Sequence, residues 1–575
     1  MHSTLLPAKS TSNLFFVSFR IAICLALFSL LNGVSSAVLA STFYVKTTGT
    51  GNGSGSWANA SSDLQATINA ANAGDEVWVA GGTFQPAAFT YFSMKEGVKI
   101  YGGFAGTEIN LASRDLTITA NKSILRGVQS SVNTIRNSGN GLTTAAVLDG
   151  FTASGETSGI FNANSSPMFV NVIITDNGLN GAGMRNENCS PVLVNCAIVR
   201  NQGAGIENIT ASPILTNCTI VDNVPSGQTA TGMRNSSNSF PQIRNSIIFG
   251  RLGIPDGVPG IINETGSSAV IRYSIVQRVY DENPDHHNAP RAVDPLFVNA
   301  EAGDYRLQQC SPGVNKGNSG YYASGQTPNL TTITTDLAGN PRFYGQGTVD
   351  MGAYEYQGAT SVGVPGVWYV KAGGTGSGAS WECASGSVQL AISSAASGEQ
   401  VWVAEGTFYP DQEDGLARAL IMKEGVKVYG GFAGTETNLA SRDVTINANK
   451  SILQGLPSVL YTINNTGNAL TTAALLDGFT VSGGTSGILN SNSSPMFVNV
   501  IITGNTGGGP GMRNENSSPV LVNCSIVKNL GVGMVNSGAS PILTNCTIAD
   551  NKSDGEDLIA GVNNTDNSSP EMKLG

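Results

Sequence analysis

Charge is scarce in this 575-residue sequence. Asp, Glu, Lys and Arg together make up 12% of it, about half of the ~25% that is usual in globular proteins. The formal net charge is -10, so the composition offers no basic surface of the kind that binds nucleic acid or anionic lipid. We therefore expect no nucleic-acid partner.

Histidine, cysteine and the common catalytic motifs are also rare or absent. The chain has three histidines and eight cysteines, and no Cys/His spacing suggests a zinc site. The GxSxG, P-loop and dinucleotide-binding fingerprints are missing. This cysteine usage fits an exported protein without a disulfide framework. Cys196 with Cys218, and Cys524 with Cys546, share one column of adjacent repeats; stacking would put them within disulfide range, but we interpret them as small core thiols.

Long apolar runs are missing everywhere except near the N-terminus. There, Lys9 and Arg20 precede the run IAICLALFSLL, and Val38-Leu39-Ala40 offers a small-residue cleavage site. The pattern predicts a secretory signal peptide over residues 1–40, with an uncleaved anchor helix as the alternative. We expect a secreted or cell-surface protein with no membrane span after signal cleavage.

What the sequence has in abundance is glycine, 71 residues, and one repeated phrase. The phrase occurs within residues 159–223 as GIFNANSSPMFVNVIITDN, GMRNENCSPVLVNCAIVRN and GIENITASPILTNCTIVDN, at steps of 24 and 22 residues. A looser fourth repeat follows as GMRNSSNSFPQIRNSIIFG. A fixed period in this range predicts a solenoid, in which each repeat buries its apolar face against its neighbours.

The repeats align on a shared asparagine, which occupies positions Asn171, Asn195, Asn217 and Asn245. The residue two positions before it is always large and apolar, and the residue three positions after it is always isoleucine. No repeat has room for a helix between these apolar positions. We therefore predict an all-β fold, a right-handed parallel β-helix with the asparagine at a corner and rungs about 4.8 Å apart. Stacked side-chain amides explain the asparagine column without a metal ion.

A short amphipathic helix is predicted ahead of the repeats. Its apolar positions lie at i, i+4 and i+7, which are Leu64, Ile68 and Ala71. Ser61 or Ser62 can cap its start and Gly74 can end it. A solitary helix in this place would cover the open end of the apolar stack.

The chain then repeats itself. After a linker at 357–366, WYVKAGGTGSGASW returns to the opening, and the aligned asparagine recurs as Asn499, Asn523 and Asn545. We predict two tandem β-helices, 41–356 and 367–575, each opened by a capping helix. The final stretch NSSPEMKLG is followed by no second end region, and we interpret the second β-helix as truncated.

Several of these phrases resemble a known group of proteins. SSPVLVNCAIVRN and ASPILTNCTIVDN resemble the "SP-x-x-x-N-C-x-I-x-x-N" rungs of secreted bacterial β-helix proteins of the pectate-lyase-like superfamily, which includes polymorphic outer-membrane adhesins. DPLFVNAEAGDYRLQQCSPGVNKG, TDLAGNPR and VDMGAYEY resemble the choice-of-anchor Q domain, over about 246–356. The resemblance implies a β-helix at the cell surface, associated with the outer membrane. It does not imply an activity, because this fold carries both enzymes and inert surfaces.

Catalysis on such a fold would need paired carboxylates, or a calcium-binding acidic cluster with a basic residue beside it. The strongest candidate cluster lies in one long segment and comprises Asp281, Glu282, Asp285, His286, His287 and Asp294. Within it, Asp281, Asp285, His286, His287 and Asp294 are the catalytic candidates, and Asp281, Glu282 and Asp285 are the candidate calcium ligands. We favour the alternative, a solvated acidic insertion.

The remaining charged and aromatic positions are interpreted as structural. Arg185 over Glu207, and the column Asp176, Arg200 and Asp222, would form ion pairs between neighbouring rungs. Glu108, Arg114 and Asp115 lie in a glycine-rich turn where arginine commonly satisfies carbonyls and carboxylates. All five tryptophans, Trp57, Trp78, Trp368, Trp381 and Trp402, lie in the two opening segments and suit cap packing better than sugar binding.

Together these observations predict a non-catalytic adhesin or scaffold, secreted or displayed at the cell surface, with a polysaccharide or another surface as its partner. The alternative is a polysaccharide lyase or glycoside hydrolase acting on extracellular polysaccharide. We expect no cofactor, with calcium as the one ion worth testing.

Overall fold

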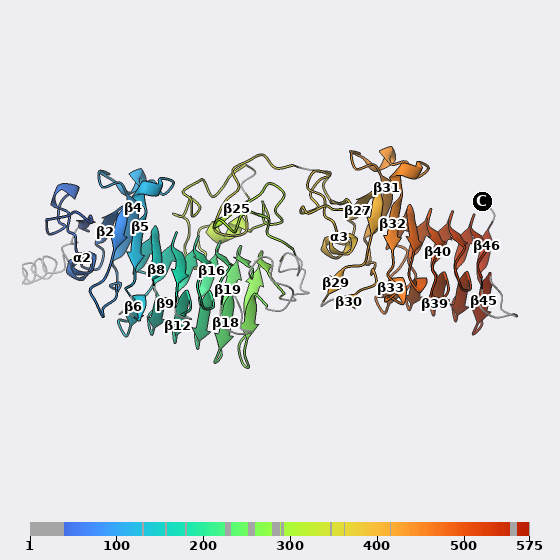
Figure 1. The fold of residues 1–575 in the computed structure, drawn as a ribbon, viewed down its shortest axis with the longest axis horizontal. Helices are drawn as coiled ribbons and strands as arrows, with labels where there is room; N and C mark the ends of the chain where they lie inside the picture. Colours follow the sequence, from blue (N-terminus) through green and yellow to red (C-terminus); the bar gives the residue numbers. More distant parts are fainter. Residues whose placement is uncertain are drawn as a thin grey trace, which may run out of the picture.

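The chain forms a mostly parallel β-solenoid with very little helix (Figure 1). The computed structural model describes residues 40–573 except 129–131, 156–157, 179–180, 225–231, 251–258, 279–287, 289–292, 346–347, 362, 414–415 and 553–560. The parallel strands form two series along the long axis, which we call the first stack (42–276) and the second stack (367–573). The predicted parallel β-helix architecture is confirmed; its handedness and the status of the stacks as tandem β-helices stay predictions.

Three sheets run along the first stack, and we call them A, B and C. Sheet A contains β1 (Thr42–Val45), β2 (Glu76–Ala80), β4 (Lys99–Phe104), β7 (Val147–Asp149), β10 (Met168–Val170), β13 (Val192–Val194), β16 (Ile214–Thr216), β19 (Gln242–Arg244) and β22 (Val270–Arg272). Sheet B contains β3 (Gly82–Phe84), β5 (Ser123–Arg126), β8 (Phe151–Gly155), β11 (Ile173–Asn177), β14 (Ala197–Val199), β17 (Thr219–Val221), β20 (Ile247–Ile248) and β23 (Ile275–Val276). Sheet C contains β6 (Asn133–Ser138), β9 (Ser158–Ala163), β12 (Met184–Glu187), β15 (Ile206–Ile209), β18 (Met233–Ser236) and β21 (Ile261–Asn263).

The second stack has three corresponding sheets, D, E and F. Sheet D contains β26 (Val367–Val370), β27 (Gln400–Ala404), β31 (Lys427–Phe432), β34 (Leu475–Asp477), β37 (Met496–Val498), β40 (Val520–Val522), β43 (Ile542–Thr544) and β46 (Glu571–Lys573). Sheet E contains β28 (Gly406–Phe408), β32 (Ser451–Gln454), β35 (Phe479–Ser482), β38 (Ile501–Thr503), β41 (Ser525–Val527) and β44 (Thr547–Ala549). Sheet F contains β33 (Tyr461–Thr466), β36 (Ser486–Ser491), β39 (Met512–Glu515), β42 (Met534–Ser537) and β45 (Val562–Thr565).

The aligned apolar columns form the core, as the repeats predicted. Phe169, Leu193, Leu215 and Ile243 pair in register on neighbouring strands of sheet A, and each is fully buried. The asparagine that follows each of these strands has a φ near +50°, for example 51° at Asn195. Asparagine tolerates this left-handed conformation better than most residues, which explains why the corner between sheets A and B keeps an asparagine in every repeat.

Buried amide ladders form a second, polar part of the interior. In sheet C, Asn162 donates from Nδ2 to Oδ1 of Asn186 at 2.9 Å, and Asn186 donates in the same way to Asn208 at 3.0 Å. A parallel ladder joins Asn177, Asn201 and Asn223 at 2.7 and 2.8 Å. Within each ladder one amide donates to the oxygen of the next, so these buried side chains hydrogen-bond to one another and fix the register of the rungs. Among the described residues, Asn177 Oδ1 at the start of the second ladder has no hydrogen-bond partner.

Two short helices open the stacks, α2 (Leu64–Ala70) and α3 (Val388–Ser394). Helix α2 is where the apolar spacing placed it, with Leu64 and Ile68 buried. Its predicted boundaries were wrong: the cap is Asp63, which accepts from Ala66 N, and the helix ends before Ala71 rather than at Gly74. A carboxylate accepts this N–H as well as a serine hydroxyl does. The Ser61 hydroxyl lies in the turn before the helix, where it accepts the Asp63 N–H.

Cap packing accounts for the tryptophans. Trp78 stacks on Phe104 with ring centroids 4.8 Å apart, and Trp57 donates from its indole N–H to the Glu108 carbonyl at 2.9 Å. Trp402 and Trp381 make the same two contacts in the second stack, with Phe432 and the Glu436 carbonyl. These tryptophan rings pack within the opening segments of the two stacks and stabilise them.

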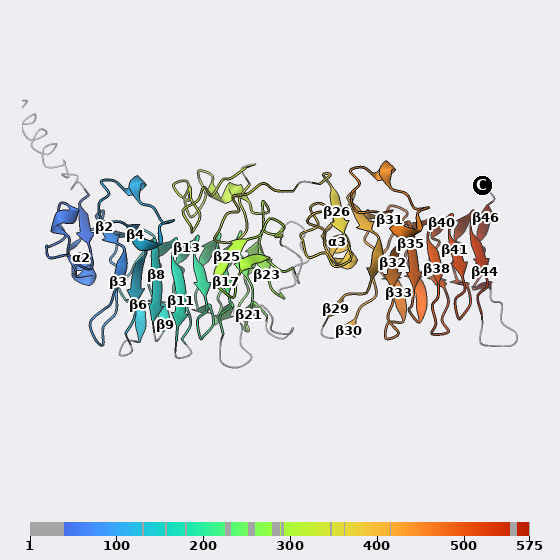
Figure 2. The same ribbon diagram turned by 45° about the horizontal axis from the view of Figure 1, so that its top comes forward.

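The segment 294–356, which we call the end region, folds back along the outer faces of sheets A and B (Figure 2). It contains the antiparallel pair β24 (Phe297–Asn299) and β25 (Asp304–Leu307) and the single turn η5 (Ser319–Tyr322). Tyr322, Leu330 and Val349 pack on the outward side chains of sheet A, and Phe297, Tyr305 and Met351 pack on those of sheet B.

A disulfide between Cys310 and Cys383 joins the end region to the opening of the second stack. The sequence did not predict this bond, because the two cysteines are 73 residues apart and lie in different segments. The four stacked cysteines are free thiols, as predicted. Burial raises the pKa of Cys196 well above its usual range, so this thiol stays neutral in the core.

Candidate functional site

The predicted acidic cluster lies almost wholly outside the described residues. Asp281, Glu282, Asp285, His286 and His287 are not described, so their catalytic or calcium-binding role stays a prediction. Asp294 is described and exposed, and its carboxylate accepts the Leu296 N–H at 2.8 Å in the turn before β24. Within the described ranges, no group of three His, Cys, Asp or Glu side chains could hold a metal ion.

The charged residues of the glycine-rich turn are structural. Glu108 accepts the N–H groups of Ala105, Gly106 and Thr107; burial opposes ionisation, but these bonds hold its pKa below the usual range. Arg114 bonds to Asp149 at 3.1 Å and to the Gly102 carbonyl. Asp115 accepts from Thr117, which is two residues away. The second stack repeats the pattern with Arg442 and Asp477 at 2.9 Å.

Two of the predicted ion pairs between rungs are confirmed, Arg185 with Glu207 and Arg200 with Asp176. Arg185 lies opposite Glu207 on sheet C at 3.2 Å and also contacts Glu187 at 2.7 Å. Arg200 lies 3.3 Å from Asp176. Asp222 instead accepts from the Tyr305 hydroxyl of the end region at 3.0 Å, a contact that the repeats alone did not predict.

The outer face of sheet C carries a row of arginines and aromatic rings, which we call the sheet C row. It comprises Tyr91, Arg136, Phe161, Arg185, Glu207 and Arg234. From Arg136 to Arg234 the residues are opposite one another on successive strands. An arginine thus recurs on every second rung, at a spacing of about 9.6 Å for rungs about 4.8 Å apart.

The first arginine of the row is held by rings rather than by a carboxylate. The Arg136 guanidinium lies 4.4 Å from the centroid of Phe161 and 6.0 Å from that of Tyr91, and it donates to Asn133 Oδ1 at 3.2 Å. Such stacking fixes the guanidinium plane. Among the described residues, no carboxylate forms an ion pair with Arg136. Further along, Arg234 pairs with Glu264 at 2.5 Å. Sequence reasoning noticed only Arg185 and Glu207, because the row becomes visible only once the strands are in register.

The end region contains the most buried charges of the described chain. Arg342 is fully buried and donates to Asn195 Oδ1 at 2.8 Å, to the Ala353 carbonyl at 2.7 Å and to Glu355 at 3.2 Å. Asp350 is also buried and accepts the Asn315 and Tyr356 N–H groups at 2.6 Å. These contacts anchor the end region to the asparagine corner of the solenoid.

The pKa values of the two buried carboxyls, Asp350 and Glu355, are set mainly by their burial, and only Glu355 forms an ion pair with Arg342. Burial, together with the neighbouring Asp350 charge, raises the pKa of Glu355 to about 8, against the opposing effect of Arg342. Burial likewise raises the pKa of Asp350 to about 6, although two backbone N–H groups and Arg342 oppose it. A proton is therefore retained on this cluster at pH values where exposed carboxyls have lost theirs.

We expect the stability of the end region to fall as the pH rises from about 5 to 8. A carboxyl whose pKa is higher in the folded than in the unfolded state holds its proton more tightly when the protein is folded. Its stabilising contribution is complete below the unfolded-state pKa and is lost as the pH rises through the folded-state pKa. Glu355→Gln should remove the part of this dependence that Glu355 contributes and leave the part that Asp350 contributes. The difference in unfolding free energy between wild type and variant should therefore change steadily over that range. A difference independent of pH would show that Glu355 is ionised throughout.

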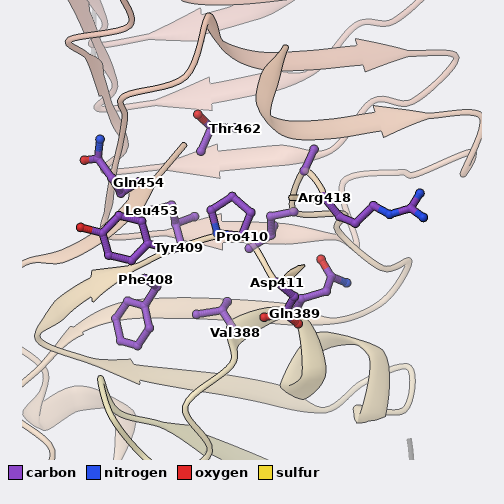
Figure 3. A pocket seen from close by; sticks show the side chains of 12 residues that line it. Val388, Gln389, Phe408, Tyr409, Pro410, Asp411, Arg418, Leu453, Gln454 and Thr462 are labelled. Atoms are coloured by element: carbon purple, nitrogen blue, oxygen red, sulfur yellow. The ribbon is translucent and has the colours of Figure 1, made fainter. Parts of the chain in front are cut away.

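A small pocket lies between α3, β32 and the segment 408–420 of the second stack (Figure 3). It is lined by Val388, Gln389, Phe408, Tyr409, Pro410, Asp411, Arg418, Ala419, Leu420, Leu453, Gln454 and Thr462. Its polar groups serve the helix: Ser387 caps α3 and donates to Asp411 at 2.7 Å, and Gln389 accepts the Ile421 N–H at 2.7 Å. We interpret the pocket as part of the cap.

No family model and no curated protein matches this sequence. Among solved structures, a pectate lyase, Pel9A, matches at 13% identity over 56% of this chain and 98% of its own, with a TM-score of 0.23. A mannuronan C-5 epimerase A-module of Azotobacter vinelandii, AlgE6, matches at 8% identity over 88% and 94%, with a TM-score of 0.17. The PL6 family alginate lyase AlyGC matches at 10% over 89% and 81%, with a TM-score of 0.18. At such scores we carry no residue role from these proteins to this chain.

Proposed function

We propose that this protein is an exported β-helix protein that binds an acidic polysaccharide along the sheet C row without cleaving it. The observation that carries the proposal is the row itself, in which Arg136, Arg185 and Arg234 recur on every second rung beside Phe161 and Tyr91. Guanidinium groups bind carboxylates through paired hydrogen bonds. The exposed Tyr91 ring and the partly exposed Phe161 ring offer apolar surface to a sugar. A straight row suits a linear polymer better than a small molecule.

The location and organisation of the protein are part of the proposal. The disulfide supports an oxidising compartment, in line with the predicted signal peptide. We propose two tandem right-handed β-helices, and an end region of the choice-of-anchor Q type that belongs to a protein of the outer cell surface. Calcium is kept as a variable in the experiment because acidic polysaccharides bind it.

The second candidate is a polysaccharide lyase or glycoside hydrolase, and one observation favours it. Glu187 and Glu207 both contact Arg185, so two carboxylates flank one guanidinium in the middle of the row. Paired carboxylates are what glycoside hydrolysis requires. All three are partly exposed, with 41%, 31% and 27% of the Arg185, Glu187 and Glu207 side chains accessible. A bound polymer would therefore contact them directly.

Binding of pectate and alginate to the full-length chain, measured with and without calcium, tests the proposal, with a neutral glucan as the control polymer. We expect Arg136→Ala to weaken binding of the acidic polymers by about 10-fold, because it removes a positive charge from the row, and Phe161→Ala to have a similar effect. The chain provides a matched control, because the corresponding positions of sheet F are Asn464 and Leu489. Their alanine variants should bind as the wild type does.

The same samples distinguish binding from catalysis. Release of unsaturated or reducing ends that stops in Glu207→Gln would establish the enzyme and reject the non-catalytic proposal. Equal binding by wild type and Arg136→Ala would show that the sheet C row is not the binding surface.

A further inference from the structure

The outer faces of sheets D and E in the second stack have largely the same residues as the outer faces of sheets A and B, which the end region covers in the first stack. In the first stack the end region buries Val192 and Val194 to 4% and 0% exposure, along with Asn195 at the corner. Figure 1 shows the end region, in yellow-green, along the first stack, whereas no described segment lies on the same side of β40 and β46. The residues at these positions of the second stack keep their identity but not their burial.

The correspondence is residue by residue. Val520, Val522 and Asn523 stand where Val192, Val194 and Asn195 stand, on strands with the same register. The two valines are partly exposed and the asparagine is exposed, whereas Asn195 is fully buried. Ile501, the counterpart of the partly buried Ile173, is 38% exposed. Apolar side chains that are buried in one stack thus face solvent in the other.

The occupant of this surface in the first stack shows what chemistry fits. Tyr322 and Leu330 pack on the valines of sheet A, and Arg342 donates to the corner asparagine at 2.8 Å. The corner amides in turn donate to backbone carbonyls, Asn195 to that of Thr335 at 2.7 Å and Asn217 to that of Asp350 at 2.7 Å. A segment that docks here needs aromatic and aliphatic side chains, one arginine and free carbonyls.

We propose that the outer faces of β37, β40 and β43 in sheet D and of β38, β41 and β44 in sheet E form a docking surface. Its occupant is an end-region segment with the chemistry of residues 294–356. Within its described residues this chain has two such surfaces but one end region, and that region is bound to the first stack and tied by the Cys310–Cys383 disulfide. A second surface of the same composition is therefore available for a second segment of the same kind. This assembly role is independent of the polysaccharide proposal.

A polypeptide of residues 294–356 carrying Cys310→Ser, labelled with a fluorophore, is the probe. Titrated onto the oxidised full-length chain, it should bind one saturable site. Val522→Glu in the full-length chain should weaken binding at least about 10-fold, because it places an unpaired charge under the apolar rows of the segment. Arg513→Ala, on the outer face of sheet F, is the matched control and should leave binding unchanged.

A graft makes the test independent of how well the free polypeptide folds. Strand β46 pairs with β43 in the same register as β19 pairs with β16, so Glu571 corresponds to Gln242. In the graft, residues 242–356 of the first stack and its end region therefore replace residues 571–575. In this graft, a Val522→Cys thiol should be protected from a maleimide that labels it in the ungrafted chain.

Two outcomes would overturn the inference. Absence of protection in the graft would show that the surface does not accept this segment. Self-association of the ungrafted chain that Val522→Glu abolishes would make the occupant a second copy of the second stack.

Discussion

Replacing Arg342 by alanine is expected to destabilise the end region by about 3–5 kcal/mol, because it leaves several buried acceptors without their donor at about 1–3 kcal/mol each. The change removes the donor to Asn195 Oδ1 and to Glu355, and neither acceptor has water to replace it, because both residues are buried. The first stack should remain folded, since its core does not include this side chain. Native-state hydrogen exchange across residues 296–356 measures the loss directly.

A second arginine on the same stack provides the comparison. The Arg185 side chain is 41% exposed and its ion pairs lie at the surface, so Arg185→Ala should cost no more than about 1 kcal/mol. Equal losses for the two variants would mean that the end region is held by its apolar contacts alone.

Replacing Asn186 by leucine is expected to lower the stability of the first stack by about 2–5 kcal/mol. The substitution leaves Asn162 Nδ2 and Asn208 Oδ1 without partners, and both side chains are at most 1% exposed. Each unsatisfied buried group costs about 1–3 kcal/mol. Because rungs depend on their neighbours, we expect the loss to appear as earlier unfolding of the whole stack in a denaturant titration.

The end of the same ladder is the control. Asn263 accepts from Asn235 at 2.8 Å but is exposed, so water can replace it, and Asn263→Leu should cost less than about 1 kcal/mol. If both substitutions cost the same, the ladder would not depend on burial and its hydrogen bonds would contribute little to register.

The repeats allowed the solenoid to be predicted, because each rung buries its own apolar column and the neighbouring rung supplies the partner. The contact between Phe169 and Leu193 could be predicted because the two residues occupy equivalent positions of consecutive repeats. The contact between Arg342 and Asn195 could not, because these residues are 147 positions apart in the sequence. No periodicity links the two, and the same holds for Cys310 and Cys383.

The candidate binding surface was only partly visible in the sequence for a related reason. Arg185 and Glu207 occur at equivalent places in consecutive repeats, so their pairing could be predicted. Arg136 and Phe161 come before the clear repeats begin, and only the strand register of β6 and β9 places them in the same row. The acidic cluster at 281–287 remains a prediction, since it lies outside the described part of the chain.

The disulfide between Cys310 and Cys383 also decides how the chain would carry mechanical force. A pull applied between the first stack and the second passes through this covalent bond and bypasses residues 311–382. The linker at 357–366 and the docked part of the end region after Cys310 would bear no tension along the backbone while the bond is intact. Reduction would place the same load on the Arg342 anchor and the apolar contacts of the end region, which are far weaker than a covalent bond.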